Sequence, residues 1–355
     1  MRIGIIAPPW YPVPPWGYGG TEGMIDVLAR GIMAAGHDVC LFTTADSTCP
    51  VPRLHLLPEG LGVAAMADET AELTHLDAAY SHLDDCDVIH DHTLLGPAVQ
   101  SASCPVVTTV HGPIDTRTRQ FLATYPGNVL PTAISHSQRG LAPSGSFSAV
   151  VHHGIDMRHW PVGSGSGGYL LFLGRMSPDK GVDAAITVAR RAGMPLRIAA
   201  RIRGPEEKRY FIEAVRPRLG GTVEFLGEVG PGERLALLGE ATALLNPLRW
   251  SEPFGLVMIE ALAVGTPVVT TRWGSSPEIV SHGLTGHLAA TTSDLVDGCR
   301  LAASLDRDEC RASAVERFSA ERMVEEYLDL YRSALHPGPG VDLRGSGATA
   351  VVGDG

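Results

Sequence analysis

Residues 250–269, WSEPFGLVMIEALAVGTPVV, carry the pattern that decides the fold of this chain. A turn at Gly255 precedes an apolar run that predicts a helix, and residues 267–270 then predict a buried strand. Glu252 lies on the loop before this helix, whereas Glu260 lies about one and a half turns inside it. Free backbone N–H groups at a helix N-terminus suit a phosphate, and a carboxylate suits a pair of sugar hydroxyls. The stretch therefore indicates a site for a phosphorylated sugar, with a buried connector between two surface glutamates as the alternative.

Short apolar runs alternate with helical segments along most of the chain, which is typical of parallel β/α units. The first helical segment carries Met24, Leu28 and Ile32 on one face, as expected of a helix that covers a sheet. The fold class that follows is α/β with doubly wound parallel sheets, whose ligands bind beyond the carboxyl ends of the strands. Strands are expected at residues 3–7, 39–44, 87–90, 105–111, 129–135, 149–152, 169–173, 196–200, 223–226, 243–246 and 267–271.

A Gly- and Ser-rich run separates two such blocks of strands and helices. We expect an N-terminal domain over residues 1–160 and a C-terminal domain over 169–318, joined by a flexible linker at 161–168. A closing helix at 319–335 can pack back on the N-terminal domain. Residues 336–355 are rich in Gly, Pro and Ser without periodicity, so we expect them to be disordered.

Charge and composition exclude several classes of function. The formal net charge of −11 argues against nucleic acid as a partner. Residues 1–160 hold seven Arg, no Lys and fifteen acidic residues, which makes this domain a poor surface for docking on an anionic membrane. No run approaches the roughly 18 apolar residues of a membrane span, and the first apolar run is too short for a signal peptide. Because the six cysteines have no metal-binding spacing either, the sequence predicts a cytoplasmic protein with reduced thiols.

A second cluster of charged residues follows the strand at 169–173, where Gly174-Arg175 precedes Lys180-Gly181. The guanidinium of Arg175 offers a planar fork of donors and Lys180 offers a mobile point charge, and a diphosphate binds both kinds of cation. A lysine at a helix N-terminus is disfavoured by the helix dipole, so its presence indicates a ligand that supplies negative charge. The alternative is an ordinary surface arginine beside a lysine that starts a helix.

The N-terminal domain offers further candidates at the ends of its strands. The loop Gly17-Tyr18-Gly19-Gly20-Thr21-Glu22 begins ten residues after the first strand, so its spacing does not fit a dinucleotide-binding loop and disfavours a dehydrogenase. His111 ends the strand at 105–111, and His92 follows the strand at 87–90, which places both at the ligand-binding edge. A structural role alone is the alternative for each of these residues.

The block EPFGLVMIEALAVGTPVV, the pattern G-R-x4-K-G and the GGTE loop together resemble the signatures of the family 4 retaining glycosyltransferases. The resemblance covers about residues 1–333, with the more specific motifs in the second half. It implies the GT-B fold, in which two Rossmann-like domains face each other across a cleft. It also implies a nucleoside diphosphate sugar as donor and retention of configuration at the anomeric carbon.

The resemblance further implies roles for individual residues. Glu252 would contact hydroxyls of the transferred sugar, and a histidine that matches His111 lies near that sugar in the family. Glu260 would bind the ribose diol, whereas Glu22 and His92 would contact the acceptor. The residues implied to bind the donor are Gly19, Gly20, Arg175, Lys180, Phe254, Gly255, Leu256, Val257 and Glu260.

We therefore expect a hexosyltransferase that uses UDP-glucose or a similar donor. The aromatic loop at 10–18 suggests a soluble small-molecule acceptor, aromatic or polyol in character. No carboxylates or histidines have metal-ligand spacing, so we expect no metal and no other cofactor, with the leaving-group charge falling on Arg175, Lys180 and the helix N-terminus.

Three alternatives use a similar scaffold: a non-hydrolysing isomerase or epimerase, a pyridoxal phosphate phosphorylase, and a sugar-nucleotide-binding protein. The phosphorylase needs a Schiff-base lysine, but a diphosphate explains Lys180 better. The binding protein has no need of Glu252 and His111.

Overall fold

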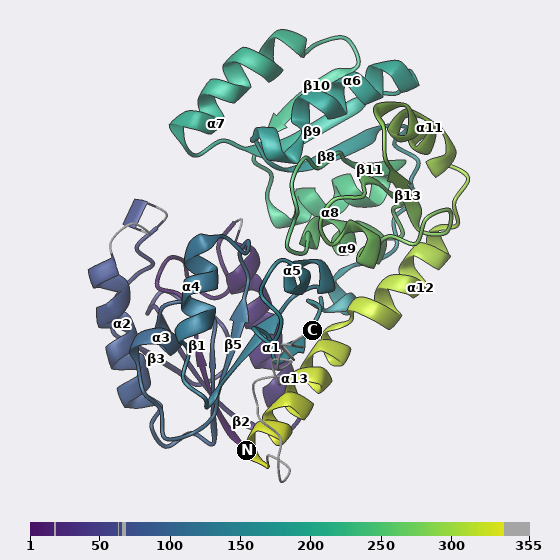
Figure 1. Cartoon of the computed structure of the whole chain (residues 1–355). Helices are drawn as coiled ribbons and strands as arrows, with labels where there is room; N and C mark the ends of the chain where they lie inside the picture. Colours follow the sequence, from purple (N-terminus) through teal and green to yellow (C-terminus); the bar gives the residue numbers. More distant parts are fainter. Residues whose placement is uncertain (18, 63, 66–68, 337–355) are drawn as a thin grey trace, which may run out of the picture. The chain divides into compact units, whose positions relative to one another are not determined.

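The structure is a computed structural model that describes residues 1–17, 19–62, 64, 65 and 69–336. The chain divides into two compact units (Figure 1). Unit 1 consists of Met1–His152 and, of the described residues, 323–336, whereas unit 2 is His153–Arg322. The segment predicted to be disordered lies outside the described residues from residue 337 onward, as does Tyr18 of the predicted aromatic loop.

Unit 1 contains a seven-stranded parallel sheet with the strand order β3-β2-β1-β4-β5-β6-β7. The strands are β1 Arg2–Ile6, β2 Asp38–Thr43, β3 Arg53–His55, β4 Val88–Asp91, β5 Val106–Val110, β6 Val129–Ala133 and β7 Ala149–Val150. The helices are α1 Gly20–Ala34, α2 Glu69–His82, α3 Gly96–Val99, α4 Thr116–Thr124, α5 His136–Gly140 and α13 Ala320–Leu335, which begins in unit 2 and continues in unit 1.

Helices cover both faces of this sheet (Figure 1). Leu76 and Ala79 of α2 and Leu122 of α4 pack against strand residues such as Ile6 and Val110 on one face. On the other face α1 and α13 lie side by side, and Tyr331 of α13 is fully buried. Burial on both faces explains why the strands read as continuous apolar runs rather than as alternating ones.

We expect a side chain at Gly31 to destabilise unit 1, because Val324 of α13 packs against this glycine of α1. A Cβ atom on Gly31 would lie 2.4 Å from Cγ2 of Val324. Gly31→Val should therefore lower the stability of unit 1 by about 1–3 kcal/mol, the usual cost of overpacking. Gly23→Val in the same helix is the matched control, since no atom lies within 4 Å of its added Cβ. Equal losses of hydrogen-exchange protection in unit 1 for both variants would contradict the prediction.

Unit 2 contains a six-stranded parallel sheet with the strand order β10-β9-β8-β11-β12-β13. The strands are β8 Leu170–Arg175, β9 Leu196–Arg201, β10 Val223–Gly227, β11 Ala243–Asn246, β12 Val268–Thr271 and β13 Gly286–Ala289. The α-helices are α6 Val182–Ala192, α7 Pro205–Tyr210, α8 Pro231–Glu240, α9 Leu256–Ala263, α10 Ser276–Ile279, α11 Thr292–Ala302 and α12 Arg307–Phe318. Shorter helical turns are η2 Met157–His159, η3 Pro178–Lys180, η4 Phe211–Val215 and η5 Arg216–Arg218.

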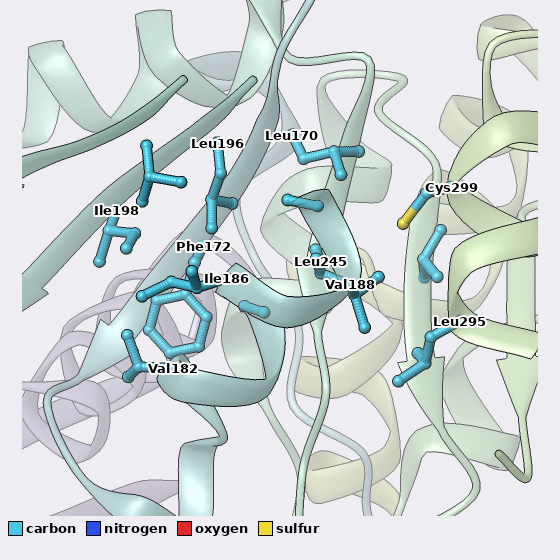
Figure 2. Close-up of a cluster of buried hydrophobic side chains, with 14 of the residues drawn as sticks. Leu170, Phe172, Val182, Ile186, Val188, Leu196, Ile198, Leu245, Leu295 and Cys299 are labelled. Atoms are coloured by element: carbon cyan, nitrogen blue, oxygen red, sulfur yellow. The ribbon is translucent and has the colours of Figure 1, made fainter. Parts of the chain in front are cut away.

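A core cluster of unit 2 lies between this sheet and helices α6 and α11 (Figure 2). Ile186 of α6 and Leu295 of α11 pack with the strand residues Phe172, Ile198 and Leu245. Because parallel strands buried in this way are held rigidly, the loops that leave their carboxyl ends start from fixed positions.

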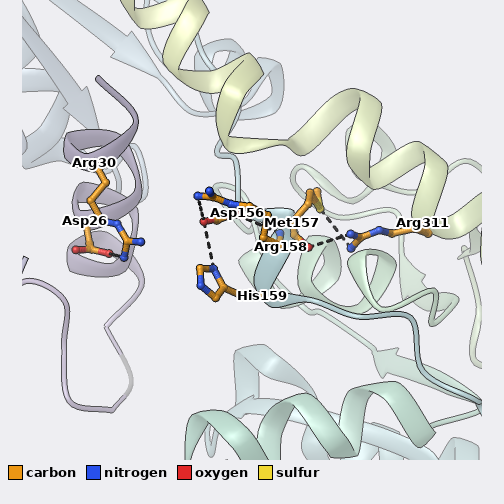
Figure 3. A network of polar contacts seen from close by, with 7 residues as sticks. All are labelled: Asp26, Arg30, Asp156, Met157, Arg158, His159 and Arg311. Atoms are coloured by element: carbon orange, nitrogen blue, oxygen red, sulfur yellow. Dashed lines mark hydrogen bonds and ion pairs between the residues drawn. The ribbon is translucent and has the colours of Figure 1, made fainter. Parts of the chain in front are cut away.

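Two arginines of α12 hold the segment that precedes β8. Nε of Arg307 donates to the backbone oxygen of Gly163 at 3.0 Å. Nη1 and Nη2 of Arg311 donate to the backbone oxygens of Trp160, at 2.7 Å, and Met157, at 2.9 Å, and Figure 3 shows Arg311 directed at Met157. Rather than a flexible linker, residues 161–168 are thus a hydrogen-bonded part of unit 2.

The α/β prediction is confirmed, since both sheets are parallel and covered by helices. All the predicted strands are present, but β3 and β13 were not predicted. The closing helix predicted at 319–335 corresponds to α13. Among the described residues, no helix combines the length and the apolar character that crossing a membrane requires.

Candidate functional site

The predicted donor-binding residues of unit 2 lie where the sheet reverses its strand order. β8 and β11 are neighbours at the centre of the sheet, and the chain continues from β8 to β9 on one side and from β11 to β12 on the other. Ligands of doubly wound sheets bind outside the carboxyl ends of the strands at this position. Arg175 ends β8, Lys180 follows it, and Glu252 lies on the loop that follows β11. The fold therefore gathers these three residues at one edge of the sheet.

Lys180 and Glu252 form an ion pair at this edge, and Trp250 contacts both of them. Nζ of Lys180 contacts Oε2 of Glu252, and the two side chains are only 13% and 12% exposed. Nε1 of Trp250 donates a hydrogen bond of 2.8 Å to the same carboxylate oxygen. The Lys180 ammonium lies 5.3 Å from the centre of the Trp250 ring, within the range of a cation–π contact. One carboxylate oxygen thus accepts from two donors in a site where charges interact more strongly than in water.

Two glycines allow the observed conformation of the loop between β11 and α9: one lies in this loop and the other in the loop that packs on it. Gly255, at the N-cap of α9, has a φ of +90°, which glycine adopts without steric cost. A Cβ atom on Gly274 would lie 2.3 Å from the backbone oxygen of Glu252, so the loop after β12 packs directly on the Glu252 loop. In the described part of the chain no side chain caps α9. The first N–H groups of this helix, at Leu256 and Val257, are therefore available to an anion.

Arg175 forms an ion pair with Asp179, with 3.0 Å between Nη2 and Oδ2. Both side chains are about a third exposed, at 34% and 31%. The backbone oxygen of Asp179 accepts from the N–H of Arg249 at 2.8 Å, which joins the loops after β8 and β11. The guanidinium thus lies partly exposed at the carboxyl end of β8, paired with one carboxylate.

Glu260 lies in the middle of α9 and pairs with Arg234 of α8. The distance between Oε1 of Glu260 and Nη1 of Arg234 is 3.3 Å. Burial raises the pKa of Glu260, and the nearby Arg234 partly offsets this rise. Arg234 also lies over the ring of Trp160, 5.6 Å from its centre. Glu260 is therefore a buried, oriented carboxylate rather than a surface residue.

The ring of Phe254 is buried within unit 2. The side chain is 2% exposed and packs edge-on against the rings of His153, at 5.0 Å, and Phe318, at 6.1 Å. Its backbone oxygen accepts a hydrogen bond from Oγ of Ser275. We conclude that Phe254 anchors the loop in the core of unit 2, so any contact with a donor would come from its backbone.

In unit 1 the sheet reverses its strand order between β1 and β4. The predicted residues follow these two strands, except His111, which follows the next strand, β5. Gly19 is the N-cap of α1, Gly20 is its first residue, and Glu22 lies in its first turn. Glu22 is 4% exposed, and burial raises its pKa to about 7. In the preceding loop Trp10 is buried whereas Trp16 is 78% exposed.

His92 and His111 follow the neighbouring strands β4 and β5, and their rings meet. Nδ1 of His92 and Nε2 of His111 are 2.9 Å apart, so one of them donates to the other. The ring of His90 stacks on His92 with 4.1 Å between centroids. Burial lowers the pKa of His111 to about 4 and that of His90 to about 3. At neutral pH His111 is therefore a neutral hydrogen-bonding group and not a cation.

Two tyrosines of α13 hold this histidine cluster from inside unit 1. The hydroxyl of Tyr331 lies 2.6 Å from Nδ1 of His90, whose Nε2 lies 2.8 Å from Oγ1 of Thr109. The hydroxyl of Tyr327 lies 2.8 Å from the same Oγ1. The histidines at the sheet edge are thus fixed by side chains more than 200 residues away along the chain.

Sequence patterns did not indicate the partners Trp250, Asp179 and Arg234. Trp250 lies within the motif that was recognised, but an indole in a loop has no periodic signal. Asp179 lies four residues after Arg175, a spacing that suggests an ion pair only on a continuous helix. Arg234 lies on another helix, and nothing local connects it with Glu260.

Comparison with known proteins gives matches over both units. Residues 18–163 match the family model described as Glycosyltransferase Family 4, and residues 163–316 match Glycosyl transferases group 1. The chain is 27% identical to the glycogen synthase of Mycobacterium tuberculosis (strain CDC 1551 / Oshkosh), over 92% of this chain and 91% of that protein. It is 26% identical to the phosphatidyl-myo-inositol mannosyltransferase of Mycobacterium leprae (strain TN), over 97% of this chain and 100% of that protein.

A solved structure shows the same likeness. AviGT4, a glycosyltransferase involved in avilamycin A biosynthesis, superposes with a TM-score of 0.75 and 26% identity. The superposition covers 95% of this chain and 99% of that one.

Proposed function

The chain belongs to the family 4, group 1 glycosyltransferases, which have the GT-B fold, and we propose that it transfers a hexose from a nucleoside diphosphate sugar to a soluble small-molecule acceptor. UDP-glucose is the donor that we put first. The reaction retains the configuration at the anomeric carbon and uses no metal ion.

The observation that carries this proposal is the group of charges at the sheet reversal of unit 2. Arg175, Lys180 and the uncapped N-terminus of α9 lie at one edge of the sheet, and all three favour an anion. When the bond between the sugar and the phosphate breaks, negative charge develops on the leaving diphosphate. Preorganised positive groups at that position lower the barrier without a metal ion.

The carboxylates have separate duties in this mechanism. Glu252, on the loop before α9, binds hydroxyls of the transferred sugar, and the buried Glu260 binds the ribose diol. His111 is assigned a contact with the transferred sugar, as a neutral hydrogen-bonding group. Glu22 and His92 contact the acceptor.

The charge of unit 1 supports a soluble acceptor. The mannosyltransferase relative is named for phosphatidyl-myo-inositol, a lipid, and the glycogen synthase relative for a polysaccharide. Residues 1–160 of this chain hold fifteen acidic and seven basic residues, which disfavours binding to an anionic membrane surface. The exposed Trp16, on the loop beside α1, offers an apolar face to an aromatic or polyol acceptor.

A binding panel followed by an assay in chelator tests the donor and the metal independence. Nucleoside diphosphates and their glucose conjugates should raise the melting temperature, with UDP-glucose among the strongest, because binding stabilises the folded state. Hydrolysis or transfer from UDP-glucose should persist in EDTA. Activity that disappears in EDTA and returns with Mg²⁺ or Mn²⁺ would contradict the electrostatic mechanism.

Arg175→Ala should weaken the binding of the free diphosphate about ten- to a hundred-fold, because charged hydrogen bonds contribute about 1.5–3 kcal/mol each. The matching nucleoside, which lacks phosphates, should bind almost normally. Isothermal titration of both ligands measures the difference, with the exposed Arg300→Ala on α11 as the control.

The partner of Arg175 requires a second variant. Removing the guanidinium leaves Asp179 as an unpaired carboxylate that would itself repel a diphosphate. In an Arg175→Ala/Asp179→Asn double variant this repulsion is absent, and the loss of affinity should persist. Equal losses for nucleoside and diphosphate would mean that Arg175 does not contact the phosphates.

A further inference from the structure

Glu252 has two donors on one oxygen, and the proposed function removes one of them. Lys180 and the indole N–H of Trp250 both contact Oε2 of Glu252. A donor diphosphate attracts Lys180 more strongly than one carboxylate does, because it carries more charge. Lys180 must then leave Glu252 at the step in which Glu252 has to hold the sugar.

We propose that Trp250 is a positioning residue, which keeps Glu252 in place after Lys180 has turned to the donor phosphates. This inference rests on the proposed function of the site. The indole N–H is a neutral donor with a single hydrogen, so it stays on the carboxylate when phosphates enter. The face of the same ring remains beside the Lys180 ammonium, 5.3 Å away, and accommodates a short movement of the lysine.

The backbone makes the contact between Trp250 and Glu252 rigid before any ligand binds. The N–H of Glu252 donates to the backbone oxygen of Trp250 at 2.9 Å, which closes a tight turn between them. The N–H of Ser275 donates to the backbone oxygen of Glu252 at 3.1 Å, and Gly274 packs against the same peptide group. Because the turn is tied to a second loop, the indole and the carboxylate keep their relative position without Lys180.

Trp250→Phe separates the two contacts of this side chain. Phenylalanine keeps an aromatic face for Lys180 but has no N–H to donate to Glu252. We expect kcat for UDP-glucose hydrolysis to fall about ten-fold, the effect of losing one hydrogen bond to a charged group. The KM for UDP-glucose should stay within about twofold, because Glu252 interacts more strongly with the transition state than with the bound donor. The affinity for free UDP should also stay within about twofold, because UDP has no sugar for Glu252 to contact.

Two further variants make the test specific. Trp273→Phe changes an exposed tryptophan, 53% exposed, on the next loop and should leave kcat unaltered. In a Glu252→Ala background, Trp250→Phe should cause no additional loss, because a residue that acts through Glu252 has nothing left to position.

Three outcomes would overturn the inference: an unchanged kcat in Trp250→Phe, a loss of UDP affinity as large as the loss of kcat, or a full additional loss in the Glu252→Ala background. Glu252→Gln separates failure of the inference from failure of the proposed function. If Glu252→Gln lowers kcat while Trp250→Phe does not, only the role of Trp250 is wrong. If Glu252→Gln also has a normal kcat, the proposed contact between Glu252 and the sugar is wrong. The proposed role of Trp250, which depends on that contact, is then wrong as well.

Discussion

Glu252→Gln is expected to lower kcat for sugar transfer about a hundred-fold, whereas free nucleoside diphosphate binds as tightly as in the unsubstituted protein or more tightly. The transferred sugar flattens and gains positive charge as its bond to phosphate breaks, so a carboxylate beside it stabilises the transition state more than the ground state. The expected affinity for free diphosphate follows from the structure. Lys180 pairs with Glu252 in the free protein, so a neutral glutamine releases the lysine for the diphosphate.

Glu260→Gln should have the opposite kinetic signature, although the side chain is the same. The ribose does not change during the reaction, so losing its carboxylate is a uniform loss of binding, seen as a raised donor KM with kcat little altered. Free diphosphate should bind this variant poorly. Because the substitution also removes the partner of Arg234, melting temperatures of both variants must be compared first. Equal losses of diphosphate affinity in the two variants would refute the assigned positions of sugar and ribose.

Arg307→Met is expected to destabilise unit 2 by about 3–5 kcal/mol, which is at the upper end for a single substitution. Besides Gly163, the guanidinium donates to the backbone oxygens of Gly239, at 2.9 Å, Ala241, at 3.2 Å, and Val264, at 3.1 Å, and to Oγ1 of Thr266, at 2.8 Å. An uncharged side chain removes the Arg307 donor from the oxygens of Gly163, Ala241 and Thr266, whereas those of Val264 and Gly239 still accept from the N–H groups of Gly163 and Gly165. An unsatisfied buried acceptor costs about 1–3 kcal/mol.

Hydrogen exchange read on peptides of unit 2 measures this loss, because a two-unit chain does not unfold in one step. Arg300→Met on α11, which removes an exposed arginine, is the matched control. Arg307→Lys should fall between the two, since an ammonium keeps the charge but not the fork of donors. The prediction is wrong if protection in unit 2 is the same for Arg307→Met and Arg300→Met.

The central strands could be predicted from the sequence because they are buried on both faces. Residues 39–42 and 243–245 are continuous apolar runs, and such runs have few other interpretations in an alternating β/α chain. β3 and β13 lack this signal. β3 has three residues, of which two are exposed, and β13 begins with a glycine followed by a histidine. Both lie at an edge of their sheet, where pairing with one neighbour suffices to form a strand.

Composition was misleading for residues 161–168. Four of these eight residues are glycine and two are serine, which indicates chain flexibility when the segment is considered alone. The partners that fix the segment lie far along the chain: Arg307, about 140 residues later, donates to the oxygen of Gly163, and the N–H groups of Gly163, Gly165 and Gly167 donate to backbone oxygens of Val264, Gly239 and Glu240. A side chain that distant leaves no mark on the local pattern.

The loops of the candidate site could be predicted, whereas the pairing within it could not. Motif spacing places Arg175, Lys180 and Glu252 after strands, and the strand order brings those strands together. The ion pair of Lys180 with Glu252 depends on the conformations of two loops. A single sequence does not predict which loop side chains meet. The same holds for His92 and His111, whose strands are neighbours but whose ring contact depends on side-chain rotation.

The return of α13 to unit 1 determines when that unit can be finished during synthesis. Its seven strands leave the ribosome well before Tyr327 and Tyr331, which contact Thr109 and His90. Unit 2 is continuous and is complete as soon as Arg322 has emerged. Domains usually fold in the order in which they are made. In this chain the order is reversed: the unit that is begun first keeps part of one face of its sheet uncovered until the unit made after it is complete.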